Sequence, residues 1–229
     1  MHDPSLTPFG EEQCRQLRDR FPYHHNVDLL VCSPIRRTIY TTLLGFEPEL
    51  KRGIKVIALP EAQETSDLPC DTGSDRSVLA AEMKDKPVDL SLVQEGWNSK
   101  QGKWAPDSET VRARAKAARN WLKARPEKEI VLVTHGGFLH FFTEDWTDSN
   151  KYEGTGWTNT EFRSYRFTAG DSDDANASLI ETPESRELRR GTEHPLGEAE
   201  KTQLKLTREK SKEKAERQQN TYPNPKAKV

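Results

Sequence analysis

Three short apolar runs place the tightest limit on how this 229-residue chain can fold. They are Val27–Cys32, Ile54–Leu59 and Ile130–Thr134. Each has five or six residues, which suits a strand buried on both faces and is short for a core helix. Helix-like segments separate the runs. Because strands alternate with helices, we expect an α/β fold of three layers, in which helices flank a mainly parallel sheet.

The expected helices have recognisable ends. Thr7 can cap a helix that starts at Pro8, because a proline in the first turn lacks only an N–H that would be unpaired there. Ser33 and Pro34 predict a second start of this kind, and Gly45 is a plausible stop. Two more helices are expected over Ser108–Arg125 and Phe138–Asp145, and an edge strand over Thr160–Phe167.

The end of the chain differs from the rest in composition. Of its last 59 residues, 24 are charged, only 13 are apolar, and Tyr222 is the one aromatic. Such a segment cannot bury enough apolar surface to offset the entropy that it loses on ordering. We therefore expect a domain over residues 1–168 and a charged, disordered tail over 169–229. The one role suggested for this tail is to bind a protein partner. A transient helix over Glu198–Gln219 is the alternative.

Charge and cysteine usage limit the partners and the compartment. The chain has 35 Lys and Arg against 37 Asp and Glu, a net charge of −2, which argues against a protein held on nucleic acid by bulk charge. It has no run of about 18 apolar residues that could span a membrane, and no signal peptide follows Met1. The three cysteines, Cys14, Cys32 and Cys70, are odd in number and widely spaced, which suggests free thiols. We expect a cytoplasmic protein, or also a nuclear one, that binds neither nucleic acid nor membranes.

Polar residues follow two of the predicted strands, at the edge where ligands bind in open α/β sheets. The run Ser33–Thr38 contains two arginines at a helix start, and free N–H groups beside a forked guanidinium suit a phosphate. The run His135–Gly137 places a histidine before two glycines, which let the backbone approach a ligand. A capped helix with exposed arginines, and a tight turn around a half-buried histidine, are the structural alternatives.

An acidic loop follows the remaining strand. Residues 60–75 contain two prolines, a glycine and several Asp, Ser and Thr, which predicts a loop. Its first part, Glu61–Asp67, could supply a general acid. An ordinary acidic surface loop is the alternative.

Together and in this order, these segments resemble the histidine phosphatase superfamily, the group that includes phosphoglycerate mutase. The matching segments are Leu6–Gly10, Ser33–Thr38 with Thr41 or Thr42 beyond it, the acidic loop, and Thr134–Gly137. The resemblance covers about residues 3–168. Two further stretches, Ser66–Asp75 and Gly156–Asn159, are similar to a fungal-type branch of small cytosolic members.

The resemblance implies hydrolysis of a phosphomonoester through a phosphohistidine. In the family a histidine attacks phosphorus, two arginines and a second histidine hold the phosphoryl oxygens, and a carboxylic acid protonates the leaving oxygen. Arg37 matches a phosphate-clamping arginine, and His135 matches the second histidine, which stabilises developing charge. Glu64 best matches the proton donor, and Glu61 and Asp67 are the alternatives.

The resemblance also implies what the site binds. Ser33 and Gly136 would contact the substrate beside Arg37, and the ligand would be a small phosphorylated molecule or phosphate. No metal or other cofactor is implied, because the arginines and the histidine supply the positive field that magnesium gives other phosphoryl-transfer enzymes. The fungal-type stretches favour a phosphatase over a mutase, and the substrate stays open.

One part of the family pattern has no counterpart here. The family places Arg-His-Gly, which carries the nucleophile, at the end of a first strand upstream of the Leu-Thr helix. Only five residues precede Leu6, and they contain no Arg-His pair. We therefore expect the first strand to be missing, an unpaired edge on Val27–Cys32 or Ile130–Thr134, and a chain that is catalytically inactive as written. An incomplete start is the simplest origin. A non-catalytic phosphate-binding pseudo-phosphatase or interaction module is the alternative.

Overall fold

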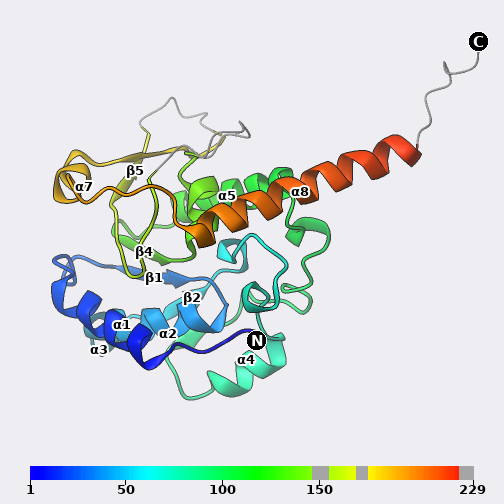
Figure 1. The fold of residues 1–229 in the computed structure, drawn as a ribbon. Coiled ribbons are helices and arrows are strands. Elements are labelled where there is room, and N and C mark those ends of the chain that lie inside the picture. The colour runs from blue at the N-terminus through cyan, green and yellow to red at the C-terminus, as the bar shows by residue number, and fades with distance from the viewer. Residues whose placement is uncertain (146–154, 169–174, 222–229) are drawn as a thin grey trace, which may run out of the picture.

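The computed structural model describes residues 1–145, 155–168 and 175–221 (Figure 1). A four-stranded parallel sheet lies at its centre, in the order β3-β2-β1-β4. The strands are β1 (Leu29–Cys32), β2 (Val56–Ala58), β3 (Val88–Asp89) and β4 (Ile130–Val133). The three predicted runs are thus all strands, and the expected α/β fold with a mainly parallel sheet is confirmed.

Side-chain alternation along β1 requires helices on both faces of the sheet. Leu29 and Val31 belong to one buried cluster, whereas Leu30 and Cys32 belong to another, because successive residues of a strand point to opposite faces. The first cluster includes side chains of helices α5 (Ser108–Lys123), α6 (Gly136–Phe142) and α8 (Glu198–Thr221). The second includes side chains of helices α1 (Pro8–Arg20), α2 (Arg36–Gly45) and α4 (Arg76–Glu82).

The remaining described elements are short and lie mostly in the connections. They are α3 (Glu47–Lys51), the 3₁₀ turns η1 (Pro60–Ala62), η2 (Pro69–Asp71) and η3 (Gly102–Trp104), the strands β5 (Tyr165–Phe167) and β6 (Leu179–Glu181), and α7 (Pro183–Leu188). β5 pairs with β6 in a separate antiparallel ladder. The strand expected over Thr160–Phe167 therefore exists as β5, but it is not hydrogen-bonded to the main sheet.

Of the two predicted helix caps at the start of the chain, one is confirmed and one is wrong. The Thr7 hydroxyl accepts a hydrogen bond from the Gly10 N–H at 3.1 Å. Ser33 does not cap α2, which begins at Arg36. Instead, the carboxylate of Asp3 accepts the Arg36 N–H at 2.9 Å. Asp3 is fully buried, so a residue far away in the sequence satisfies the first turn of this helix.

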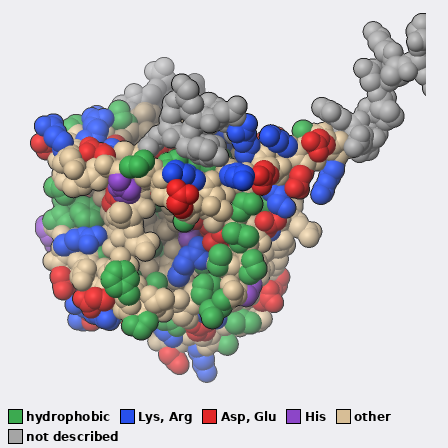
Figure 2. Space-filling view, in the orientation of Figure 1, with side chains coloured by type: hydrophobic (Ala, Val, Ile, Leu, Met, Phe, Trp, Pro, Cys, Tyr) green, Lys and Arg blue, Asp and Glu red, His purple; other side chains and the backbone are tan. Residues whose placement is uncertain are grey.

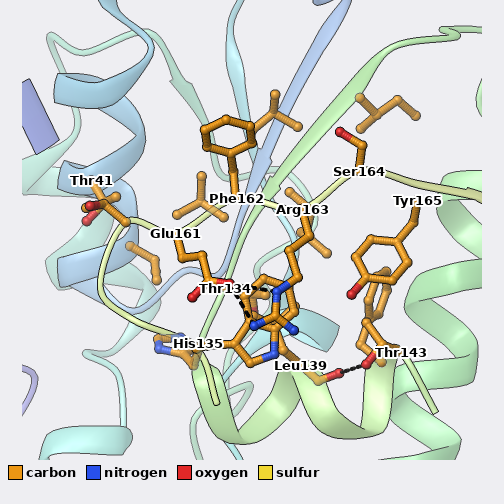
Figure 3. Close-up of a pocket in the computed structure, with 18 of the residues that line it drawn as sticks. Thr41, Thr134, His135, Leu139, Thr143, Glu161, Phe162, Arg163, Ser164 and Tyr165 are labelled. Carbon is orange, nitrogen blue, oxygen red and sulfur yellow. Dashed lines mark hydrogen bonds and ion pairs between the residues drawn. The ribbon is translucent and has the colours of Figure 1, made fainter. Parts of the chain in front are cut away.

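The β4 edge of the main sheet is open. β1 is paired on both sides, whereas β4 is paired only with β1 among the described strands. A cavity of about 1150 Å³ runs along the other edge of β4, from Glu129 to His135. The segment Phe162–Phe167 lines it from across (Figure 3). We expected an unpaired edge on either Val27–Cys32 or Ile130–Thr134. In the structure the unpaired edge is that of Ile130–Thr134.

Residues 175–221, the described part of the segment expected to be a disordered tail, contain helix, and the alternative helix expected over Glu198–Gln219 is present as α8. Among the described residues of this segment, α8 crosses the molecule beside α5 (Figure 1). Its few apolar residues are well placed: Leu204 is fully buried against the α5 and α6 side of the core, and Leu196 lies in the same cluster. Composition counts apolar residues, but packing depends on where they point. No helix in the described ranges has both the length and the apolar character of a membrane span.

A buried ion pair also holds α8 in place. The His140 imidazole on α6 lies 2.9 Å from Glu200 on α8 and 2.9 Å from Asp145. Glu200 also accepts the backbone N–H groups of Gly197 and Trp157. Burial alone would lower the pKa of His140, but the hydrogen bonds to the two carboxylates outweigh it and raise that pKa to about 9.

Truncating Leu204 tests whether α8 belongs to the core. We expect Leu204→Ala to lower the free energy of unfolding by about 2–5 kcal/mol, since a buried leucine is replaced by a cavity. Leu188→Ala is the matched control, because Leu188 is 64% exposed. Urea denaturation of the three proteins measures the effect. Equal stability of the two variants would contradict the packing of α8.

The ion pair of His140 predicts how stability depends on pH. Because its pKa is raised from 6.5 to about 9, the charged imidazole stabilises the fold fully below about pH 6.5, and this contribution is lost as the pH rises through 9. The difference in unfolding free energy between wild type and His140→Gln should therefore be larger at pH 6 than at pH 9.5, by on the order of 2–3 kcal/mol. The exposed His25 supplies the control His25→Gln, for which a pH-dependent difference of that size would contradict this origin.

Candidate active site

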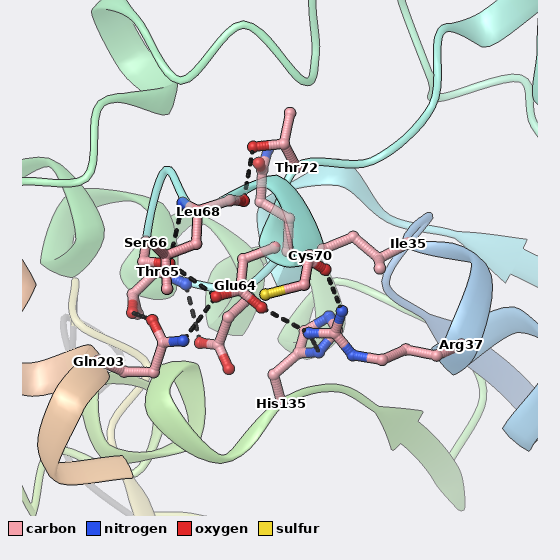
Figure 4. A network of polar contacts seen from close by, with 12 residues as sticks. Ile35, Arg37, Glu64, Thr65, Ser66, Leu68, Cys70, Thr72, His135 and Gln203 are labelled. Atoms are coloured by element: carbon pink, nitrogen blue, oxygen red, sulfur yellow. Dashed lines mark hydrogen bonds and ion pairs between the residues drawn. The ribbon is translucent and has the colours of Figure 1, made fainter. Parts of the chain in front are cut away.

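The carboxyl ends of β1 and β4 bring the two predicted polar runs together. The strands are parallel, with Cys32 opposite Val133, so the residues that follow them meet at one edge of the sheet. The Arg37 guanidinium donates to Nδ1 of His135 at 3.0 Å, and the Ser33 hydroxyl lies 2.9 Å from Nε2 of the same ring. These residues form one network (Figure 4). The face of the molecule that is drawn in Figure 2 is hollowed near its centre.

The acidic loop contributes one carboxyl group to this cavity. Glu64 is 5% exposed and lines the cavity together with Arg37 and His135. Of the two alternatives for the proton donor, Asp67 forms an ion pair with Lys210 at 3.1 Å, and neither it nor Glu61 lines the cavity. The structure therefore brings Glu64 to the predicted site and leaves the other two outside it.

The two glycines that follow His135, Gly136 and Gly137, adjoin the site. Gly136 lines the cavity. A Cβ atom on Gly137 would lie 2.7 Å from Oε1 of Glu64 and 2.9 Å from Cβ of Gln203. A glycine at position 137 therefore allows both Glu64 and α8 to approach the start of α6. Arg36, the neighbour of Arg37, points elsewhere and pairs with Glu82 at 2.8 Å.

Sequence reasoning missed several polar residues of the site. Asp71 is 4% exposed and accepts a hydrogen bond from Arg37 at 2.9 Å. Its other oxygen accepts from Ser66 at 2.6 Å and from Gln203 at 2.5 Å. The carbonyl of Cys70 also accepts from Arg37. Asp71 and Ser66 lie in the loop that was singled out, but Gln203 is 132 residues away from Asp71 and carries no local signal.

The His135 ring is neutral in this arrangement. Burial, followed by the positive charge of Arg37, lowers the pKa of His135 well below its ordinary value. Because a guanidinium can only donate, Nδ1 must accept from Arg37. Nε2 then carries the proton and donates a hydrogen bond to the Ser33 hydroxyl. Ser33 itself is fully buried and does not line the cavity.

The carboxyl group of Glu64 has the opposite tendency. Burial, and then the negative charge of Asp71, raises the pKa of Glu64 above its ordinary value. Two buried cations hold its backbone: the Lys100 ammonium donates to the Glu64 carbonyl at 2.9 Å, and Arg114 donates to the same carbonyl at 3.3 Å. Burial and the charge of Arg114 lower the pKa of Lys100 to about 7. Glu64 therefore lies between the basic side chains of Lys100 and Arg114 and the carboxylate of Asp71.

Chemically, the described residues of the site supply donors for an anion and a carboxyl group, but no free histidine nitrogen that could attack phosphorus. A guanidinium and a neutral imidazole N–H can hold phosphoryl oxygens, and a buried carboxylic acid can protonate a leaving oxygen. The same cavity continues along β4. Among the described residues, His135 is the one histidine that lines the cavity.

The chain is similar in sequence to several known proteins. A probable phosphatase of Schizosaccharomyces pombe is 26% identical over 147 residues, which are 62% of this chain and 66% of that protein. A phosphoglycerate mutase-like protein of Arabidopsis thaliana is 28% identical over 188 residues, which cover 66% of this chain and 68% of that protein. The chain therefore spans about two thirds of the length of these relatives.

One solved structure and one family model also match the chain. The mycobacterial glucosyl-3-phosphoglycerate phosphatase is 18% identical, with a TM-score of 0.48 over 79% of this chain and 87% of that one. Residues 1–173 match the model of the histidine phosphatase superfamily, branch 1. Because this match covers more than half of the chain and includes the sequence runs that meet at the pocket, the chain belongs to the histidine phosphatase superfamily.

Proposed function

We propose that this pocket binds the phosphoryl group of a phosphomonoester. We further propose that the chain is part of a phosphatase, which hydrolyses the ester through a phosphohistidine. One observation carries the proposal: Arg37, His135 and Glu64, which come from three separate segments, line the same pocket. A clamp for an anion and a protonated acid at one place fit phosphoryl transfer better than simple anion storage.

The proposed reaction has two steps. In the first, a histidine nitrogen attacks phosphorus and the ester P–O bond breaks, while Glu64 gives its proton to the leaving oxygen. In the second, water attacks phosphorus and the P–N bond breaks, while the Glu64 carboxylate takes the proton from water. Arg37 and the N–H of His135 hold the phosphoryl oxygens through both steps. The raised pKa of Glu64 supports its role as the acid of the first step.

The attacking histidine is a separate question. Neither ring nitrogen of His135 has a free lone pair, because Nδ1 accepts from Arg37 and Nε2 carries the proton. The buried His140 is paired with two carboxylates. In our proposal the nucleophile lies on a further strand that pairs with the open edge of β4. Two observations support this: the cavity extends along the whole of β4, and half-buried backbone groups on an open strand edge favour pairing. The chain as written would then bind phosphate without turning it over.

A non-catalytic phosphate-binding module is the second candidate. The single histidine among the described residues that line the cavity favours it. In that case Arg37 and His135 would hold a phosphorylated ligand, and the charged C-terminal segment would contact a protein partner. The two candidates share the same phosphate contacts and differ in whether a nucleophile is ever supplied.

Phosphate binding tests what the two candidates share. We expect the 229-residue chain to bind orthophosphate in calorimetry, and Arg37→Ala to weaken that binding by about 100-fold, because two charge-assisted hydrogen bonds are lost. Arg36→Ala is the adjacent control, since Arg36 contacts Glu82 and Asp3 instead of the pocket. A folded wild-type protein that binds no phosphate would contradict both candidates.

Turnover separates the two candidates. We expect the 229-residue chain to leave p-nitrophenyl phosphate intact. A native chain extended upstream by an in-frame strand that ends in Arg-His should hydrolyse it without added metal, and Arg37→Ala or His135→Ala should abolish that activity. Activity that persists in both variants would contradict the site. An extended chain that binds phosphate but has no activity would favour the binding module.

A further inference from the structure

One side chain of the C-terminal helix reaches the centre of the polar network. Gln203 projects from α8 into the site, between the acidic loop and the start of α6 (Figure 4). Its amide nitrogen donates to Oδ2 of Asp71 at 2.5 Å. Its amide oxygen accepts from the Thr65 hydroxyl at 3.3 Å. Gln203 therefore contacts both the counterion of Arg37 and the residue that follows Glu64.

The carboxylate of Asp71 is where this contact matters. It is the negative charge that Arg37 pairs with directly, and an oriented carboxylate fixes which guanidinium edge is left for a ligand. Oδ1 accepts from Arg37, and Oδ2 accepts from Ser66 and Gln203. If the Gln203 donor is removed, a carboxylate that is 4% exposed loses one of its three side-chain partners, and a buried charge without full hydrogen bonding is costly.

On the other side, Gln203 supports the proton donor. The Thr65 N–H donates to Oε1 of Glu64 at 2.8 Å, and the Thr65 hydroxyl is bound by Gln203. Cβ of Gln203 also packs where a side chain on Gly137 would otherwise lie. A single side chain thus connects the clamp, the acid and the start of α6.

We propose that Gln203 is a positioning residue of the phosphate site, which orients Arg37 through Asp71 and steadies Glu64 through Thr65. This inference rests on the proposed function, because it concerns the same pocket. It gives α8, which lies more than 60 residues after His135 in the sequence, a part in holding the ligand-binding groups.

Other residues of α8 carry the packing, which separates positioning from simple docking. Leu204 and Thr207 are fully buried, the Ser211 hydroxyl accepts the N–H of Ser108 at 2.9 Å, and Lys214 pairs with Asp107 at 3.1 Å. These contacts do not involve the amide of Gln203. Changing that amide should therefore alter ligand binding more than it alters stability.

Orthophosphate calorimetry on the full chain tests the proposal. We expect Gln203→Leu to raise the dissociation constant about tenfold, and Gln203→Glu to raise it further, because a carboxylate of the same size cannot donate to Asp71 and repels it. The exposed Lys205 supplies the control Lys205→Met on the same helix, which should bind as wild type does. Melting temperatures recorded in parallel show whether each variant is folded.

A double-mutant cycle with Asp71→Ala distinguishes positioning from a structural effect. If Gln203 acts through Asp71, Gln203→Leu should change the affinity by less than twofold once Asp71 is absent. Fully additive effects would overturn the proposal. Wild-type binding together with unchanged affinity in both Gln203 variants would overturn this inference alone, whereas a folded wild type that binds no phosphate would overturn the proposed function with it.

Discussion

The parallel pairing of β1 with β4 is the interaction on which the site depends. These two strands are about 100 residues apart in the sequence, yet their register places Cys32 opposite Val133. The residue that follows each strand begins a polar segment, and a hydrogen bond between Ser33 and His135 joins the two segments. A shift of one residue in this register would turn the buried side chains to the wrong face, so the packing of the core also fixes the geometry of the pocket.

The sequence predicts well those features that are decided locally. The apolar runs identify β1, β2 and β4, and Thr7 identifies a helix start, because the relevant contacts lie within a few residues. The polar run after β1 and the one after β4 identify Arg37 and His135 as neighbours in the pocket. The sequence did not identify the cap of α2, because Asp3 reaches Arg36 from 33 residues away and no local pattern records such a contact.

The C-terminal helix shows the same limit more strongly. Its composition is that of a solvated segment, and most of its surface is polar. What attaches it is a small number of distant contacts, of which the buried Leu204 and the ion pair between Glu200 and His140 are the clearest. Neither can be found by counting residue types. Gln203 lies between these two anchors, so the contribution of α8 to the site is likewise visible only in three dimensions.

The buried Asp3 has a practical consequence for handling the protein. Its carboxylate is bound to Arg36 and Ser74, and its N–H donates to the carbonyl of Pro69, next to the loop that contacts Arg37. An affinity tag or fluorescent label attached ahead of Met1 would therefore begin two residues from a buried contact with the loop that holds Arg37. A label placed after α8, whose far end extends beyond the body of the molecule (Figure 1), would leave the pocket accessible to ligands.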